Sequence, residues 1–198
     1  MSSKRVECLK DLERDSECKV VLVTKKTLSD YILPENPLHP AYEYLSETHK
    51  ADYLRTYFMN FHGGGYSDIK RTSGSWKHAF DSMESSDSWI CGYKEIEGGV
   101  AYGPHVDKWR ELVGNGSYIC KPLTPLTMEW YSEMLSLLDT KLEKLRLHPS
   151  SFPQDCAEVS SYPIEWNELL GRIFHKVCYA YRDKISNTLP MCVCRDYR

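Results

Sequence analysis

The sequence predicts one α/β domain in which helices flank a central mixed, largely parallel β-sheet. Short β-branched or aromatic runs alternate with amphipathic helical patterns, an order typical of layered α/β proteins. The chain has 198 residues, which is room for one domain of ordinary size. It contains no internal repeat, low-complexity segment or evident linker, so we assign residues 1–198 to a single domain.

Short runs of strand-forming residues predict the sheet. The clearest is the segment 19–24, Lys-Val-Val-Leu-Val-Thr, whose continuous β-branched residues are typical of a buried parallel strand. Further strands are expected at 66–69, 88–93, 99–102 and 118–120. The sequence Gly-Asn-Gly-Ser at 114–117 predicts a turn before the last of them.

Apolar residues at helical spacing predict helices at 6–12, 46–61, 76–83, 125–147 and 165–185. In the second of these, Ser46 is the expected N-cap. Its apolar stripe is expected to face the core and consists of Ala51, Leu54, Phe58 and Phe61. The buried side of the last helix is expected to hold Leu169, Ile173, Phe174, Val177 and Tyr181.

The composition is that of a soluble globular protein, with 41% hydrophobic and 27% charged residues. Its 25 basic and 28 acidic side chains lack the basic excess expected of a nucleic-acid-binding protein. No apolar run approaches the roughly 20 residues of a membrane span, and the first residues lack a signal-peptide core. We therefore expect a cytoplasmic monomer, or a piece of a larger protein, without nucleic-acid or membrane partners.

The candidate chemistry lies in the segment 49–70. Asp52 and Arg55 are three residues apart beside the apolar stripe, so both can face the loop that follows the helix. The glycines at 63–65 end that helix and allow the backbone to approach a ligand closely. Asp68 falls at a predicted strand end, the usual place for ligand groups in open α/β sheets. Two carboxylates and a guanidinium around one cleft suit a diphosphate or a polyol.

These residues resemble the signature Ala-Asp-x-x-Arg, then Gly-Gly-x-Tyr-x-Asp-x-Asp, of GT-A glycosyltransferases with a DXD sugar-binding region. The matching positions are Ala51, Asp52, Arg55, Gly63, Gly64, Tyr66 and Asp68. This group includes capsular-polysaccharide transferases and mannosyltransferases, and more distantly the glucosylating clostridial toxins. Overall, the chain is similar to the glycosyltransferase domains of large chlorella viruses, which build their own capsid glycans.

The resemblance implies a GT-A-like fold that transfers a hexosyl or deoxyhexosyl group from a nucleotide-diphosphate sugar, with a UDP-sugar as the expected donor. The acceptor would be a hydroxyl of a glycan or glycoprotein, in viral glycan synthesis in the host cytoplasm. Retention of the anomeric configuration and assistance by Mn²⁺ or Mg²⁺ are also implied. Asp52 and Arg55 would bind hydroxyls of the donor sugar, and Asp68 would contact ribose, sugar or metal. The rest of the implied donor site is Gly64, Gly65, Tyr66 and Ser67.

Two features depart from the family pattern. Lys70 stands where the family has its second aspartate, the direct metal ligand. An ammonium group can neutralise a diphosphate without a metal ion, so Lys70 joins Asp68 as a candidate catalytic residue. Alternatively, Asp68 holds the metal with a distant histidine, for which His175 is the candidate, although a histidine on a helix surface is the simpler interpretation. In addition, no strand of the base-binding type precedes Lys19, which leaves base recognition open.

Other candidates lie in the C-terminal half. In retaining family members an acidic residue in the region of Asp155 often contacts the acceptor, so Asp155 is a candidate catalytic residue; the alternative is a loop aspartate that caps the next turn. Trp166 and Tyr162 are candidates for stacking on a sugar, with core packing as the alternative. P-loop, nucleophile-elbow and H-E-x-x-H motifs are absent from the sequence.

Two other functions fit the same residues. One is a catalytically silent sugar-nucleotide or glycan-binding module in which Lys70 has replaced the metal ligand. The other is an interaction domain in which Asp52 and Arg55 form only a surface ion pair, which contributes little to stability. Turnover of a sugar nucleotide distinguishes a transferase from both.

Overall fold

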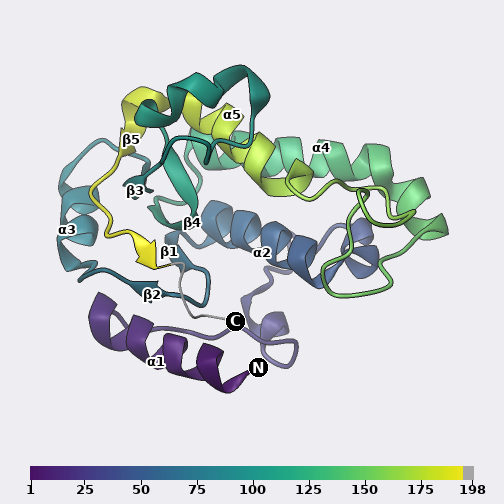
Figure 1. Cartoon of the computed structure of the whole chain (residues 1–198), viewed down its shortest axis with the longest axis horizontal. Coiled ribbons are helices and arrows are strands. Elements are labelled where there is room, and N and C mark those ends of the chain that lie inside the picture. Colours follow the sequence, from purple (N-terminus) through teal and green to yellow (C-terminus); the bar gives the residue numbers. More distant parts are fainter. Residues whose placement is uncertain (194–198) are drawn as a thin grey trace.

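The computed structural model describes residues 1–193, in which helices surround a small β-sheet (Figure 1). The α-helices are α1 (Ser3–Ser16), α2 (Glu47–Phe61), α3 (Lys77–Ser85), α4 (Pro125–Leu147) and α5 (Ile173–Ala180). The strands are β1 (Gly64–Ser67), β2 (Arg71–Thr72), β3 (Ile90–Lys94), β4 (Val113–Cys120), β5 (Ile185–Ser186) and β6 (Cys192–Val193). A helix long and apolar enough to cross a membrane is not found among the described residues.

The main sheet has the strand order β1-β4-β3-β5, and β2 pairs with β6 in a separate two-stranded sheet. Strand β4 pairs antiparallel with both β1 and β3, and the two-residue strand β5 pairs parallel with β3. The sheet is therefore mixed and flanked by helices, as expected. The expectation of a largely parallel sheet is wrong, because β4 pairs antiparallel with both of its neighbours and only the short pairing of β3 with β5 is parallel.

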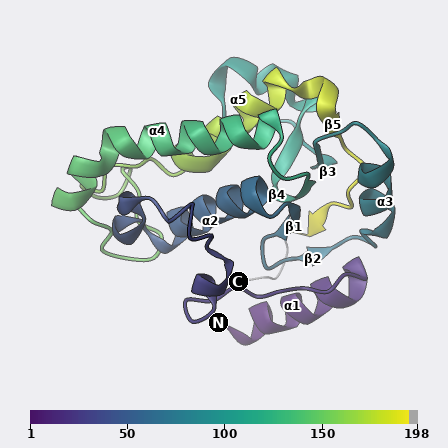
Figure 2. The ribbon, with the colours of Figure 1, turned by 180° about the vertical axis from the view of Figure 1, so that it is seen from behind.

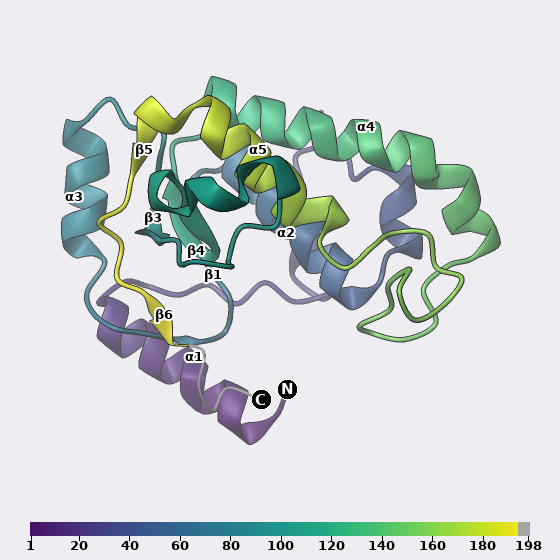
Figure 3. The same cartoon turned by 45° about the horizontal axis from the view of Figure 1, so that its top comes forward.

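Successive residues of β4 serve two separate cores, as the pleat of a strand requires. Tyr118 and Cys120 pack into a large core shared with α2, α4 and α5. Ile119 points into a smaller core with Trp76 and Met83, on the side of α1 and α3. Figures 2 and 3 show α4 and α5 on one side of the sheet and α1 and α3 on the other.

Helix α2 has the predicted bounds but buries a different face. The Ser46 hydroxyl accepts a hydrogen bond from the His49 backbone N–H, which confirms the N-cap. The buried apolar side chains are Tyr53, Tyr57 and Met59, whereas Ala51 of the predicted stripe is exposed. Both tyrosine hydroxyls accept backbone N–H groups of the loop before α2, so their polar ends are satisfied inside the core. The other predicted stripe residues are only partly buried: Leu54, Phe58 and Phe61.

The segment 19–24 is not a strand, although it has the strongest β-forming sequence in the chain. It pairs with no strand within residues 1–193, and Val21 and Leu22 remain 52% and 40% exposed. A high β-propensity reflects a good fit to a pleated, half-buried surface, and here no strand offers one. The predicted strand at 99–102 is also absent, since these residues form part of an irregular connection between β3 and β4.

The predicted turn at 114–117 is wrong, because these residues form the middle of β4. The glycines serve packing: a Cβ on Gly114 would lie 2.1 Å from the ring of Tyr93 on the neighbouring strand β3. The Tyr93 hydroxyl also accepts the backbone N–H of Gly116 at 3.3 Å. Glycine therefore makes room for an aromatic ring that crosses the sheet surface at this point.

The C-terminal helical region is shorter and less regular than predicted. It begins with a π-helical turn (Glu168–Arg172), continues as α5 and ends in a 3₁₀ turn (Arg182–Lys184) before β5. The predicted buried residues are in the core, except that Tyr181 is only partly buried.

Candidate functional site

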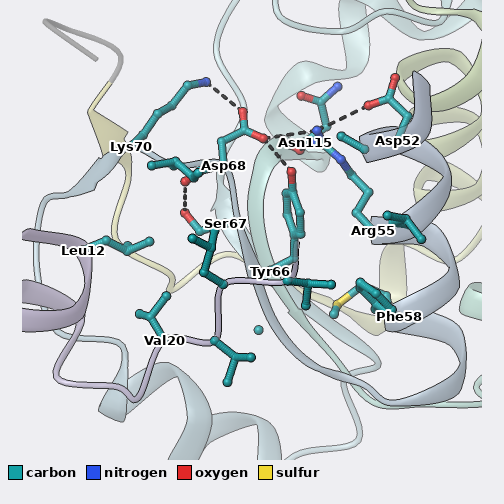
Figure 4. Close-up of a pocket in the computed structure, with 18 of the residues that line it drawn as sticks. Leu12, Val20, Asp52, Arg55, Phe58, Tyr66, Ser67, Asp68, Lys70 and Asn115 are labelled. Atoms are coloured by element: carbon teal, nitrogen blue, oxygen red, sulfur yellow. Dashed lines mark hydrogen bonds and ion pairs between the residues drawn. The ribbon is translucent and has the colours of Figure 1, made fainter. Parts of the chain in front are cut away.

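A cavity of about 830 Å³ follows helix α2 along most of its length. Residues of α2 line one side, and residues of α1 and the extended segment 18–23 line the opposite side (Figure 4). The part near the C-terminal half of α2 is largely apolar, with Phe58, Phe80 and Val20 among its lining residues. The exposed segment 19–24, predicted as a strand, thus contributes to the wall of the cavity.

Arg55 is the centre of the polar part of this cavity. Its Nη2 atom lies 3.3 Å from Asp52 Oδ1 and 3.2 Å from Asp68 Oδ1, so one guanidinium connects two carboxylates. Its Nη1 atom donates to the Asn115 carbonyl oxygen at 3.0 Å. The guanidinium also stacks over the Tyr66 ring, 4.3 Å from the ring centroid. Arg55 is only 8% exposed, so these contacts hold it in a single orientation (Figure 4).

Asp68 accepts hydrogen bonds on both carboxylate oxygens. Oδ1 accepts from the Tyr66 hydroxyl at 2.7 Å, and Oδ2 accepts from Lys70 Nζ at 2.9 Å. Its backbone N–H donates to the Gly116 carbonyl oxygen of β4, which continues the pairing past the end of β1. The Ser67 hydroxyl donates to the Asp68 carbonyl oxygen at 2.8 Å. The end of β1 thus fixes the position of this carboxylate.

The surroundings shift the pKa values of these groups in different directions. Burial raises the pKa of Asp52 to about 6, although Arg55 acts against this shift. Burial also acts to raise the pKa of Asp68, but the charges of Arg55 and Lys70 outweigh it, and the net pKa lies below the usual value. Burial raises the pKa of Tyr66 well above its usual value, so its hydroxyl stays a donor at neutral pH.

The predicted glycines have separate positions. Gly65 lines the cavity, and a Cβ on it would lie 3.0 Å from the Trp76 ring. Gly64 adopts a positive φ of 77° where the chain turns from α2 into β1, and it is not among the residues that line the cavity. Gly64 therefore allows the backbone conformation of the turn, whereas Gly65 lacks a side chain that would crowd the Trp76 ring at the cavity wall.

The residues present do not fit a divalent metal ion. A group of three or more histidine, cysteine, aspartate or glutamate side chains that could hold a metal does not occur among residues 1–193. Asp68 is already neutralised by two cations, and the Lys70 ammonium lies at the carboxylate oxygen that a metal would use. A second cation at this position would be repelled by the lysine charge.

His175 lies elsewhere, completely buried in α5. Its Nε2 atom lies 3.1 Å from Glu95 Oε2, and its Nδ1 atom accepts the backbone N–H of Ala101 at 2.9 Å. Because Nδ1 accepts a hydrogen bond, Nε2 carries the hydrogen atom and donates a hydrogen bond to the Glu95 carboxylate. The structure therefore does not bring His175 to Asp68, and the alternative of a surface histidine is also wrong.

Asp155 is buried inside its own loop. Its carboxylate accepts the Ser151 backbone N–H and the Ser160 hydroxyl, and it is not among the residues that line the cavity. The backbone N–H among these partners belongs to Ser151, four residues earlier, so Asp155 holds its own loop together instead of capping the next turn. Tyr162 is 1% exposed and its hydroxyl contacts His49 Nδ1, so it belongs to the core. Trp166 differs, since it is 48% exposed and lines the cavity.

Asn115 and Asn167 are among the polar residues of the cavity that the sequence patterns missed. Asn115 belongs to the sequence Gly-Asn-Gly-Ser, which is typical of a turn, and Asn167 lies at the start of the predicted helix 165–185. Neither position indicates a ligand-binding residue. A resemblance to known proteins could have drawn attention to them, but comparison of the chain with protein-family models, curated proteins and solved structures finds no significant match.

Proposed function

We propose that the chain is a glycosyltransferase that binds a nucleotide-diphosphate sugar in the cavity along α2. The observation that carries the proposal is the convergence of Asp52, Arg55, Tyr66, Asp68 and Lys70 on one wall of that cavity. Asp52, Arg55, Tyr66 and Asp68 are the residues expected from the resemblance to GT-A enzymes, and Lys70 is the residue that departs from it. Their charges combine two carboxylates with two cations, which suits a ligand that carries both hydroxyls and a diphosphate.

Each residue then has a role in the transfer. Asp52 accepts hydrogen bonds from hydroxyls of the donor sugar, and Arg55, fixed by its contacts, orients both Asp52 and the sugar. The reaction breaks the bond between the anomeric carbon and the β-phosphate oxygen and forms a bond from that carbon to an acceptor hydroxyl of a glycan. It releases a nucleoside diphosphate and the hydroxyl proton. The transferred group is expected to be a hexosyl or deoxyhexosyl group from a UDP-sugar.

Lys70 supplies positive charge for the leaving group in this proposal. Negative charge grows on the β-phosphate as the glycosidic bond breaks, and a cation beside it lowers the barrier. Asp68 holds the Lys70 ammonium at 2.9 Å and so sets its position. Because the residues do not fit a divalent metal, donor binding is expected to be independent of Mn²⁺ and Mg²⁺.

Calorimetric titration with UDP-glucose, with and without Mn²⁺, tests the proposal. Wild type is expected to bind equally in both conditions, and Lys70→Met is expected to weaken binding by about 10- to 100-fold, the value of one charge-assisted contact. Lys70→Asp restores the family motif and is expected to make binding depend on Mn²⁺. Lys26→Met, at an exposed lysine away from the cavity, is the matched control.

Binding of no sugar nucleotide under any of these conditions would refute the donor site. The second candidate function, a catalytically silent binding module, is favoured by the same Lys70–Asp68 ion pair, since the family's metal ligand is replaced. Release of UDP from UDP-glucose over hours, measured by chromatography, separates the two. A silent module binds the donor but leaves it intact.

A further inference from the structure

We propose that Trp166 and Asn167 form the acceptor subsite, where the apolar face of a pyranose ring of the acceptor glycan stacks on the indole of Trp166. This inference rests on the proposed function and adds to it the place and the chemical class of the second substrate. Nothing in the roles of Asp52, Arg55, Asp68 and Lys70 requires an exposed aromatic side chain, so Trp166 needs a separate explanation.

Trp166 combines exposure with a position in the cavity wall. It is 48% exposed, whereas Trp76 and Trp130 are at most 5% exposed. Phe152 and Val159, from the same loop region, are also exposed but do not line the cavity. An indole has a flat apolar face and one N–H donor, a combination suited to ligands that are apolar on one side and polar on the other. A pyranose ring has such a C–H face, surrounded by hydroxyls.

The subsite lies at the end of the cavity where α2 begins. Thr48 lines the cavity together with Trp166 and Asn167, and Asp52 and Arg55 follow along the same helix. With 1.5 Å of rise per residue, Asp52 is roughly 6 Å and Arg55 roughly 10 Å along the axis from Thr48. The opposite end of the cavity, with Phe58 and Phe80, is apolar. An acceptor at the Trp166 end would therefore lie next to the donor sugar held by Asp52.

The backbone around Trp166 is held in place. The backbone N–H of Trp166 donates to both carboxylate oxygens of Glu158, at 3.1 Å each. The Ala157 N–H donates to the Ile164 carbonyl oxygen at 2.8 Å, which closes the loop that precedes Trp166. The backbone here therefore loses little conformational freedom when a ligand binds.

Asn167 supplies the polar part of the subsite. Its side chain makes no hydrogen bond within the described part of the chain, although the residue is half-buried and lines the cavity. Its backbone carbonyl accepts the Arg172 N–H at the start of the π-helical turn. Single π-helical turns often occur at functional sites. The amide can both donate to and accept from sugar hydroxyls, which would orient the ring on the indole.

Nuclear magnetic resonance of the indole N–H groups tests the subsite without requiring any activity. The probes are methyl pyranosides of glucose, galactose, mannose, xylose and rhamnose, with the open-chain polyol sorbitol as the ligand control. The Trp166 signal, assigned with Trp166→Phe, is expected to shift with at least one pyranoside, with or without UDP present, and not with sorbitol. A Trp166 signal that no pyranoside moves would overturn the proposal. The shift is measured on the wild-type protein, and the variant Trp166→Phe serves only to assign the signal.

Transfer kinetics give the second readout. With the methyl pyranoside that shifts the Trp166 signal as acceptor, Trp166→Ala is expected to raise the acceptor KM by about tenfold while the Kd for UDP-glucose stays unchanged. Trp166→Phe keeps a ring and should recover part of that loss, and Phe152→Ala is the matched control at an exposed aromatic outside the cavity. An unchanged acceptor KM in Trp166→Ala would refute the subsite. If pyranosides shift Trp166 but no sugar nucleotide binds, the subsite stands and the proposed transferase fails.

Discussion

Two of the groups of ionisable side chains in the described structure differ in whether all their hydrogen bonds are made within the protein. The pair Glu95–His175 lies in the core, and Glu95 Oε1 also accepts the Ile96 backbone N–H, so each of its polar atoms has a protein partner. The group around Arg55 faces a cavity. There, Asp68 keeps 26% of its side chain exposed, and Arg55 Nε has no partner among the described residues.

This difference distinguishes a structural role from a candidate binding role better than residue type does. Both groups contain residues that the sequence nominated as functional. The Glu95–His175 pair joins the connection between β3 and β4 to α5. Its hydrogen bonds are all made within the protein, so no atom of the pair is left to bind a ligand. A group with spare hydrogen-bonding capacity at a cavity wall can exchange contacts with a ligand.

Arg55→Ala is expected to have the largest effect on stability. It leaves the buried Asp52 next to the half-buried Asp68 without the cation between them, and removes the donor to the Asn115 carbonyl. The free energy of unfolding should fall by about 3 to 5 kcal/mol, measured by urea denaturation. Arg146→Ala, which breaks an exposed ion pair with Glu143 on α4, should change it by less than about 0.5 kcal/mol. Equal losses in the two variants would contradict the contrast.

Asp52→Asn is expected to show a stability difference from wild type that depends on pH. The pKa of Asp52 is about 6 in the folded protein, and its ordinary value, which applies to the unfolded chain, is 3.8. Between these values the unfolded chain releases the proton that the folded protein keeps, so wild type loses stability as pH rises from about 4 to 6. The variant should therefore gain up to about 3 kcal/mol on wild type across this window and hold that gain at higher pH. Denaturation at pH 4, 5, 6 and 7 measures it, and a flat difference would contradict the buried carboxylate.

His175→Leu is expected to reduce stability by about 2 kcal/mol, because the Ala101 N–H and the Glu95 carboxylate lose a buried partner. Calorimetry with UDP-glucose should give the same Kd as wild type, since His175 contributes nothing to the cavity wall. If this variant loses donor binding or binds the donor only with a metal ion, His175 takes part in donor binding. The Glu95–His175 pair would then not be purely structural.

Local sequence determined the long helices and the candidate site. Ser46 caps α2 and Thr124 caps α4, each through a hydrogen bond to a backbone N–H three residues later, so the signals lie within a few residues of the helix start. Asp52 and Arg55 share a helix face for the same local reason. Asp68 and Lys70 follow within one short turn and strand, and so the predicted donor residues do lie together.

Tertiary structure decided what depends on a distant partner. The segment 19–24 has the composition of a strand, but no strand of the described chain pairs with it. The sequence around Gly114 is typical of a turn, whereas in the structure this glycine lies within a strand against the Tyr93 ring. His175 meets a glutamate 80 residues away, a contact that no local pattern encodes. The exposure of Trp166 likewise follows from the packing of its loop. Caps and helix faces follow from neighbouring residues, whereas strand pairing, burial and cavity walls depend on which surfaces the whole chain brings together.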